Sequence, residues 1–171
     1  MRDTKELFDR QEIIDVMHAY CRFVDLNIPE RQVECFTSDA VADYYGGVEL
    51  VGREEILGML KKALSRFTAT CHTLSNIEIS FDGEDMAKSV SYVQAWHRKP
   101  SGPEDDYEVR GQYHDNWVRT DEGWRISYRK FLTMAATPPR PDAPGIGRIA
   151  CHFGSNREKI STRETTLKLD V

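Results

Sequence analysis

The spacing of apolar residues changes once along the chain, near residue 73, and this change limits the folds open to the sequence. Before that point apolar residues recur at helical intervals through residues 5–26 and through residues 52–67. The first of these segments is interpreted as one or two helices. After it they alternate with polar residues, which is typical of half-buried strands. The predicted strands are 74–81, 86–99, 107–120 and 124–134. Helices followed by long strands indicate an α+β fold, with the helices on one face of a curved, mixed or antiparallel sheet.

Two shorter elements separate the long helical segments. Pro29 suits the first turn of a short third helix, which is expected to bury Phe36. A short strand is expected over 41–45, closed by a pair of glycines. The segment "SGPEDD" at 101–106 is expected to be a loop.

The C-terminal part of the chain has a different composition. The stretch "TPPRPDAPGIG" is rich in proline and glycine, which exclude regular secondary structure. We therefore expect one domain over residues 1–135, a size that supports its own hydrophobic core. Residues 136–171 are expected to form an extension, either a lid on the domain or an arm onto a neighbouring subunit.

Composition and charge exclude several classes of partner. The 171 residues carry a formal net charge of −5 at pH 7, and basic residues are scattered among acidic ones, which argues against a nucleic-acid partner. No stretch approaches the roughly 20 apolar residues of a membrane helix. The polar N-terminus lacks a secretory signal, so the sequence indicates a cytoplasmic protein without membrane partners. An uncovered face of a curved sheet needs a partner, and we expect a homo-oligomer, a dimer or a trimer.

Cofactor and metal motifs are absent from the sequence. The four cysteines show no zinc-ligand spacing and are interpreted as free thiols. There is no phosphate-binding glycine loop, no HExxH and no GxSxG. We therefore expect no metal and no cofactor, and chemistry that depends on ordinary titrating side chains.

Histidine is the first side chain to consider for acid–base chemistry near neutral pH, and the chain has five. His18 lies off the apolar stripe of the first helix, and alternation puts His114 on the polar, solvent-facing side of its strand. His152 falls in the C-terminal extension. His97 shares a strand face with small residues, so two interpretations stay open, a cavity residue or a solvated strand end.

His72 lies in "TATCHTLSNIEIS", between the last turn of a helix and the start of a strand. To act as a base it needs a carboxylate on its other ring nitrogen, which fixes the tautomer and stabilises the imidazolium. Asp25 is the best candidate, because an acid between apolar neighbours at a helix C-terminus is unfavourably placed and needs a partner. The alternatives from spacing alone are a solvated turn histidine and a surface acid.

The order of elements, together with "YCRFVD", "CHTLSN" and "GQYHDNWVRTDEGWRISYRKF", resembles the SnoaL-like branch of the NTF2-like superfamily over residues 6–134. Within that branch the sequence resembles scytalone dehydratase, hexachlorocyclohexane dehydrochlorinase and bile-acid 7α-dehydratase. The resemblance implies a cystatin-like cone of three helices on a curved sheet, and a cofactor-independent lyase with its pocket inside the cone. It also implies that Asp25 and His72 form the catalytic dyad of that pocket.

The same resemblance implies further substrate-binding residues. Tyr20 matches a pocket tyrosine of the bile-acid enzyme, and Tyr44 matches a water-holding tyrosine of scytalone dehydratase. His97 stands at the position of a second histidine in that enzyme, and Tyr113 replaces a pocket asparagine. Gly111 stands where that enzyme has a serine, so one polar contact of the pocket is changed in this chain.

The predicted function is a dehydratase-type elimination by this dyad on a small cyclic or aromatic hydroxylated substrate. Arg129 either contacts the substrate as an oxyanion partner or points to solvent, because a strand bulge reverses the direction of a side chain. The residues expected to form apolar walls are Phe23, Val93, Trp117 and Phe131.

Two alternatives to this function stay open. One is an isomerase or a formaldehyde-releasing C–C lyase that uses the same dyad. The other is a non-catalytic small-molecule-binding protein, or a subunit like the β subunit of ring-hydroxylating dioxygenases. The non-catalytic subunit would have a filled cone and no need for a contact between Asp25 and His72.

Overall fold

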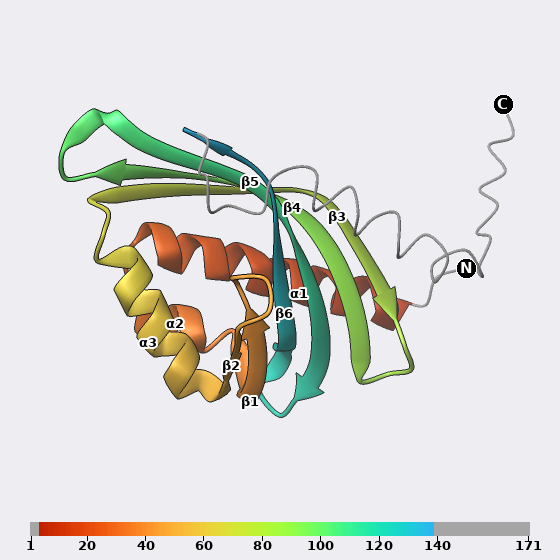
Figure 1. The fold of residues 1–171 in the computed structure, drawn as a ribbon. Coiled ribbons are helices and arrows are strands. Elements are labelled where there is room, and N and C mark those ends of the chain that lie inside the picture. Colours follow the sequence, from red (N-terminus) through yellow and green to blue (C-terminus); the bar gives the residue numbers. More distant parts are fainter. Residues whose placement is uncertain (1–3, 139–171) are drawn as a thin grey trace, which may run out of the picture.

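The computed structural model describes residues 4–138, which form three helices and six strands (Figure 1). The helices are α1 (Thr4–Asp25), α2 (Pro29–Val33) and α3 (Gly52–Leu64). The strands are β1 (Phe36–Asp43), β2 (Glu49–Val51), β3 (Ala69–Phe81), β4 (Met86–Lys99), β5 (Gly102–Thr120) and β6 (Gly123–Thr137). In this part of the chain no helix is long and apolar enough to cross a membrane.

The six strands form one sheet in the order β2-β1-β6-β5-β4-β3. Neighbouring strands are antiparallel, except β1 and β6, which run parallel. Figure 1 shows the long strands β3, β4 and β5 bending over α1, with α2 and α3 on the same side of the sheet. The predicted α+β fold with a curved, mixed sheet is confirmed.

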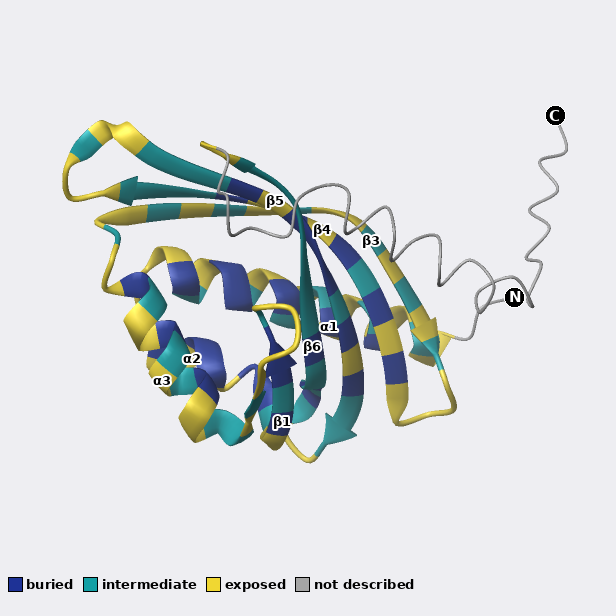
Figure 2. Ribbon diagram, in the orientation of Figure 1, coloured by how far each residue is buried: buried dark blue, intermediate teal, exposed yellow. Residues whose placement is uncertain are grey.

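The core lies between the helices and the concave face of the sheet (Figure 2). α1 contributes buried residues at helical intervals, among them Ile13, Met17, Tyr20 and Val24. In β4 buried and more exposed positions alternate, and the buried ones are small: Ala87, Ser89, Ser91, Val93 and Ala95. Small side chains on this face leave room for α1 and for a cavity.

The boundaries around β1 differ from the prediction. The short helix ends at Val33, and Phe36 begins β1 instead of belonging to the helix. β1 then extends over 36–43, where a strand over 41–45 was expected. Its parallel pairing with the distant β6 explains this extension, because such pairing leaves no local signal in the sequence. Asp43 ends the strand by accepting hydrogen bonds from the backbone N–H groups of the next turn, 45–47.

β3 and β5 both begin earlier than alternation predicts. β3 starts at Ala69, so His72 lies inside the strand, opposite Ala95 of β4, and not in front of it. All but the first residue of the segment predicted as a loop belong to β5, where the Asp106 side chain also accepts hydrogen bonds from side chains of β4. Residues 69–73 are held by backbone pairing with β4, and the start of β5 is held by the pairing of Gly102 with Lys99 and by the Asp106 hydrogen bonds, so neither stretch needs apolar alternation.

β6 runs just past the expected domain boundary and ends at Thr137. The predicted extension from residue 139 onward lies outside the described residues, and so does His152. The expectation of a lid or an inter-subunit arm therefore stays a prediction.

Candidate active site

A cavity of about 510 Å³ opens between the concave face of the sheet, α1 and α3. Its apolar lining includes Val24, Leu60, Leu64, Val93, Val109 and Phe131. Its polar lining includes two histidines, two buried tyrosines and one half-buried tyrosine: His72, His97, Tyr20, Tyr113 and Tyr44. A largely apolar cavity with a few convergent polar groups is typical of a small-molecule site.

Asp25 and His72 are in contact beside this cavity. The Nδ1 atom of His72 lies 2.8 Å from Oδ1 of Asp25, and the His72 backbone N–H donates to Oδ2 at 3.0 Å. The hydroxyl of Thr70 donates to Oδ1 at 2.8 Å. The His72 side chain is 7% exposed and the Asp25 side chain 29%. Because Asp25 holds Nδ1, Nε2 is the ring nitrogen available to a ligand in the cavity that His72 lines.

Local structure explains why these side chains meet. α1 ends at Asp25, where the helix dipole disfavours a negative charge and where donors from another element are needed. Thr70 and His72 are two positions apart in β3, so both side chains point to the face that α1 covers. The strand thus supplies three donors to the one carboxylate at the end of the helix.

These hydrogen bonds keep Asp25 ionised. Partial burial raises the pKa of its carboxyl, but the bonds from the His72 ring, the His72 backbone and Thr70 outweigh burial and lower the pKa overall. An ionised carboxylate on Nδ1 keeps a proton on that nitrogen and stabilises the positive charge when Nε2 gains a second one. The arrangement is therefore chemically suited to a general base.

His97 lies beside His72, near the end of β4. The two imidazole rings are edge to face with centroids 5.4 Å apart, and Phe67 flanks His97 at 4.5 Å. Burial, assisted by the nearby His72, lowers the pKa of His97 to about 4, so the ring is neutral near pH 7. His97 Nδ1 lies 3.3 Å from the carbonyl oxygen of Tyr107, which can only accept, so Nδ1 carries the proton. Of the two open interpretations, the structure places His97 in the cavity lining.

Tyr20 and Tyr44 form a pair of hydroxyl groups on the cavity wall. Their oxygens are 2.8 Å apart, and one hydroxyl donates to the other. Burial raises the pKa of both phenols, so both are protonated at neutral pH. Tyr113 lines the cavity next to them, with its ring edge-on to Tyr20 at 6.0 Å. These groups can donate a hydrogen bond to an oxygen of a ligand.

Arg129 neither points to solvent nor lines the cavity. The residue is 1% exposed, and its Nε and Nη2 atoms each donate to the Asp115 carboxylate at 2.8 Å. Its guanidinium carbon lies 4.2 Å from the ring centre of Tyr20 and 4.1 Å from that of Tyr113. The charge therefore lies behind the tyrosines and out of direct reach of a substrate.

Two of the four predicted wall residues do not line the cavity. Trp117 is fully buried and donates from Nε1 to the hydroxyl of Ser89, elsewhere on the concave face. Phe23 packs under the guanidinium of Arg31 on α2. Alternation gives Trp117 the same face of β5 as the cavity-lining Tyr113, but it does not predict which side chains of a long, curved strand reach the cavity. Val93 and Phe131, by contrast, line the cavity.

Gly111 makes room for Phe131. A Cβ atom at this position would overlap the Phe131 ring and the carbonyl oxygen of Leu132. The phenyl ring therefore lies directly over the glycine and beside Tyr113, with centroids 5.5 Å apart. Where the resemblance implies a serine contact, this chain has an aromatic surface.

The remaining described histidines lie away from the cavity. His18 is exposed on α1, as predicted. His114 is half-buried instead of solvent-facing, because Gln112 shares its side of β5 and contacts its Nε2 at 3.0 Å. Within residues 4–138 no group of three or more His, Cys, Asp or Glu side chains is arranged to hold a metal ion.

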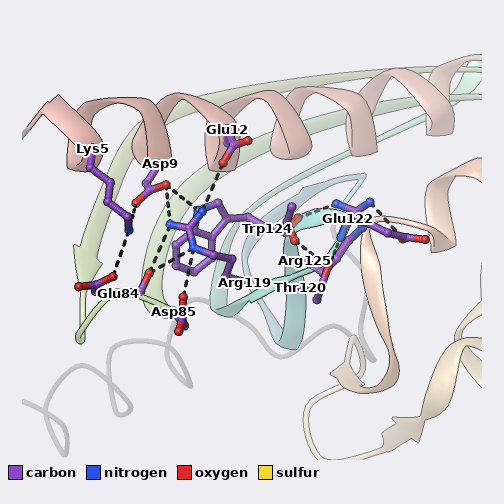
Figure 3. A network of polar contacts seen from close by, with 11 residues as sticks. Lys5, Asp9, Glu12, Glu84, Asp85, Arg119, Thr120, Glu122, Trp124 and Arg125 are labelled. Atoms are coloured by element: carbon purple, nitrogen blue, oxygen red, sulfur yellow. Dashed lines mark hydrogen bonds and ion pairs between the residues drawn. The ribbon is translucent and has the colours of Figure 1, made fainter.

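The other end of α1 is fixed by a polar network (Figure 3). Asp9 accepts hydrogen bonds from Lys5 at 3.2 Å and from the Trp124 indole at 3.4 Å, and it forms an ion pair with Arg119. Arg119 also lies over the Trp124 ring at 4.6 Å. Its other ion-pair partners are Glu12 and Asp85. This network joins α1 to β5 and β6, and none of these side chains lines the cavity.

Comparison with known proteins places this architecture in a family. The SnoaL-like domain matches residues 5–130. An uncharacterised protein of Mycobacterium tuberculosis is 30% identical over 133 residues, which are 75% of this chain and 88% of that protein. A candidate scytalone dehydratase from Novosphingobium aromaticivorans has a similar structure, with 29% identity, a TM-score of 0.74 and coverage of 80% of this chain and 91% of that one. Hexachlorocyclohexane dehydrochlorinase LinA-type3 from Novosphingobium barchaimii shares the fold at 20% identity and a TM-score of 0.70, over 80% and 93% of the two chains.

Proposed function

Because this chain belongs to the SnoaL-like family, we propose that it is a cofactor-independent lyase that removes water from a small cyclic or aromatic hydroxylated substrate. The observation that carries the proposal is the 2.8 Å contact between His72 Nδ1 and Asp25 beside an open cavity that His72 lines. The similarity to a candidate scytalone dehydratase supports the reaction class.

His72 is the base of the proposed reaction. Its Nε2 takes a proton from a carbon next to a carbonyl group or an aromatic ring, and the C–H electron pair forms the new double bond as the C–O bond of the neighbouring hydroxyl breaks. Asp25 holds Nδ1 and stabilises the resulting imidazolium. A step of this kind contributes about 100- to 10,000-fold to the rate.

The leaving hydroxyl needs a proton so that it departs as water. His97 is poorly suited to supply it, because Nδ1 donates to a backbone carbonyl and the neutral ring has no proton left on Nε2. The hydroxyl pair of Tyr20 and Tyr44 is better suited, since it lines the cavity and carries an O–H group that its internal bond does not use. The proton then returns from His72 to the tyrosine by way of water.

The size and lining of the cavity support a ring-containing substrate. A cavity of about 510 Å³ can hold a molecule with a single ring or with two fused rings. Val93, Val109 and Phe131 offer apolar contacts to such a molecule. Exclusion of water by such walls strengthens the electrostatic effect of the dyad on the reacting atoms.

The non-catalytic subunit would require a filled cone, and neither it nor a small-molecule-binding protein would need a histidine held by a carboxylate. The described cone is open, and Asp25 and His72 are in contact, so both observations favour the enzyme. An isomerase or a C–C lyase would use the same base, and only the product distinguishes these reactions from the loss of water.

The proposal is tested by incubating the protein with a panel of cyclic β-hydroxy ketones that includes 3-hydroxy-1-tetralone. Loss of water from this compound gives the aromatic product 1-naphthol, which is followed by its fluorescence. We expect turnover by the wild-type protein and a loss of at least about 100-fold in His72→Ala.

His114→Ala is the matched control, because His114 is a half-buried histidine of the same sheet that does not line the cavity. It is expected to keep the wild-type rate. Wild-type turnover in a folded His72→Ala protein would end the proposal, and so would the failure of the wild-type protein to convert any member of the panel.

A further inference from the structure

A polar side chain occupies a core position of the short helix α2. Pro29, Gln32 and Val33 are the buried residues of this helix, and their spacing is that of an apolar stripe packed against α1 and α3. Gln32 is 1% exposed, although glutamine side chains mostly lie on protein surfaces. An apolar side chain would complete the stripe, so packing alone does not explain an amide at this position.

The amide oxygen of Gln32 has no partner in the part of the chain that the structure describes. Its Oε1 atom is buried, and no group of residues 4–138 donates a hydrogen bond to it. A buried acceptor that gains no hydrogen bond destabilises the folded state, because it has lost its bonds to water. Gln112 of β5 shows the usual arrangement, since it is 3% exposed and its Oε1 lies 3.0 Å from Nε2 of His114.

Gln32 also lines the cavity, on the side that the helices form. α2 lies with α3 on one side of the sheet (Figure 1). Of the lining residues that the three helices contribute, only Tyr20 and Gln32 have a nitrogen or an oxygen in the side chain. The Tyr20 hydroxyl already bonds Tyr44, so Gln32 is the group through which the helical wall can hold a polar substituent of a ligand.

The chemistry of the amide oxygen defines what this substituent is. An amide oxygen only accepts, so its partner has to be a donor. The terminal torsion of a glutamine side chain has a broad energy profile, and Oε1 can therefore turn toward a ligand at small cost. A neutral hydroxyl group fits this acceptor better than an ammonium group, because the apolar walls of the cavity disfavour a charge.

We propose that Gln32 is a specificity-determining residue that accepts a hydrogen bond from a hydroxyl group on the ring of the ligand. This hydroxyl is distinct from the one that leaves, and it is retained in the product. His72 belongs to the sheet and Gln32 to the helical layer, so a ring between the two layers can be held by Gln32 while His72 reacts with it. The use of this contact in turnover rests on the proposed lyase function.

A matched pair of ligands tests the contact without catalysis. 2-Naphthol is a neutral phenol at pH 7 and donates a hydrogen bond, whereas 2-fluoronaphthalene has nearly the same shape and cannot donate. Dissociation constants for both are measured by NMR titration of the wild-type protein and of Gln32→Met, whose side chain has a similar length. We expect the preference for 2-naphthol to fall about fivefold or more in the variant, with the affinity for 2-fluoronaphthalene retained. An unchanged preference would overturn the proposal.

Thermal unfolding separates a ligand contact from a structural role. Gln32→Met removes an unpaired buried oxygen, so the ligand-free variant is expected to unfold at the wild-type temperature or above it. Gln112→Met is the matched control, because Gln112 is also buried but has a partner and does not line the cavity. It is expected to unfold at a lower temperature and to keep the wild-type preference. A less stable Gln32→Met protein with the wild-type preference would show a structural amide and overturn the proposal.

A second variant and a direct signal guard against a packing defect of methionine. Gln32→Leu is expected to behave as Gln32→Met, and failure of both variants to fold would identify Gln32 as a structural residue. In the wild-type protein the ¹³Cδ signal of Gln32 is expected to shift when 2-naphthol is added and to move much less with 2-fluoronaphthalene. Equal shifts with both ligands would contradict the proposed contact.

The glutamine contact and the lyase function can fail independently. His72→Ala lacks the proposed base but keeps Gln32, so Gln32→Met is expected to lower the preference for 2-naphthol in this background as well. Absence of turnover in every assay, with that effect intact, would reject the lyase and leave the contact standing. Turnover together with equal preferences in wild-type and Gln32→Met proteins would reject the contact alone.

Discussion

The two ends of α1 each carry an aspartate that the sheet holds in place, and the two aspartates differ in what surrounds their partners. Asp9 is paired with Arg119, which lies between other carboxylates and the Trp124 ring. Asp25 is paired with His72, whose ring also lines a cavity. Asp9 is 8% exposed and Asp25 29%.

A lowered pKa does not distinguish these two sites. Burial raises the pKa of both carboxyls, and hydrogen-bonded partners lower it below the usual value in each case. The chemistry of the partner makes the difference. A guanidinium keeps its protons and its charge, whereas an imidazole can take up and release a proton at a second ring nitrogen. The comparison favours a structural role for the Asp9 end of α1 and supports the proposed chemical role of the Asp25 end.

The largest expected effect comes from Asp25→Asn. The amide no longer stabilises an imidazolium and favours the wrong tautomer of His72, so turnover is expected to fall by about 100- to 10,000-fold. The rate is measured on the 3-hydroxy-1-tetralone panel, with chemical denaturation as the check on folding. A variant that keeps the wild-type rate would remove the distinction between the two ends.

Asp9→Asn is the matched change at the other end and is expected to act on stability alone. The charge of Arg119 loses its most buried partner, and we expect the free energy of unfolding to fall by about 2–3 kcal/mol. Turnover per folded molecule stays at the wild-type value. Glu12→Gln, on the exposed side of the network, is expected to cost less than about 0.5 kcal/mol in the same denaturation assay.

The third prediction concerns the pH dependence of stability at the cavity end. The pKa of His97 is about 4 in the folded protein against 6.5 without perturbation, so the unfolded chain binds the proton more readily. The free energy of unfolding is therefore expected to fall as the pH drops from about 6.5 to 4, by about 1–2 kcal/mol after allowance for partial exposure. In denaturation curves across this range, His97→Gln should show a smaller fall than wild type, and His18→Gln should match wild type. An unchanged pH dependence in His97→Gln would contradict the assignment.

The smallest effect is expected from Thr70→Val, because valine has nearly the same shape as threonine and lacks only the hydroxyl group. Removal of one of the three donors to Asp25 raises the pKa of its carboxyl and costs about 1 kcal/mol of stability. The carboxyl pKa is measured by ¹³C NMR, and turnover is expected to fall only several-fold. Thr73→Val, on the exposed face of the same strand, is the control and should leave the Asp25 pKa unchanged.

Much of the fold could be predicted from the sequence, because the change in apolar spacing indicates the long helices and strands directly. The start of β3 could not be predicted, since residues 69–73 are held by backbone pairing with β4 and show little apolar alternation. Thr70 was missed for the same reason. Once residue 70 is known to be in a strand, its position two before His72 puts both on one face.

The direction of the Arg129 side chain could not be predicted from the sequence for a different reason. Counting along β6 gives no reliable face, because the pairing of β5 with β6 shifts between Asn116 and Trp117 and again between Arg110 and Gly111. Asp115 lies two positions after Tyr113 in β5, so alternation gives both side chains the same face, and Asp115 is the partner that holds Arg129. Spacing alone gave no contact between Asp25 and His72. Its place at the helix end made Asp25 the best candidate partner of His72, and the family resemblance implied the pair, since residues on separate elements meet through tertiary structure.

The central claim is that His72 removes a proton from carbon, and the most direct test needs no leaving group. 1-Tetralone has exchangeable protons next to its carbonyl but no hydroxyl to lose, so incubation in D₂O with NMR detection reports the base alone. The account predicts that the wild-type protein catalyses deuterium incorporation at that carbon and that His72→Ala and Asp25→Asn do not. Equal incorporation in wild-type and His72→Ala proteins, or none above the rate in buffer for the wild type, would contradict it.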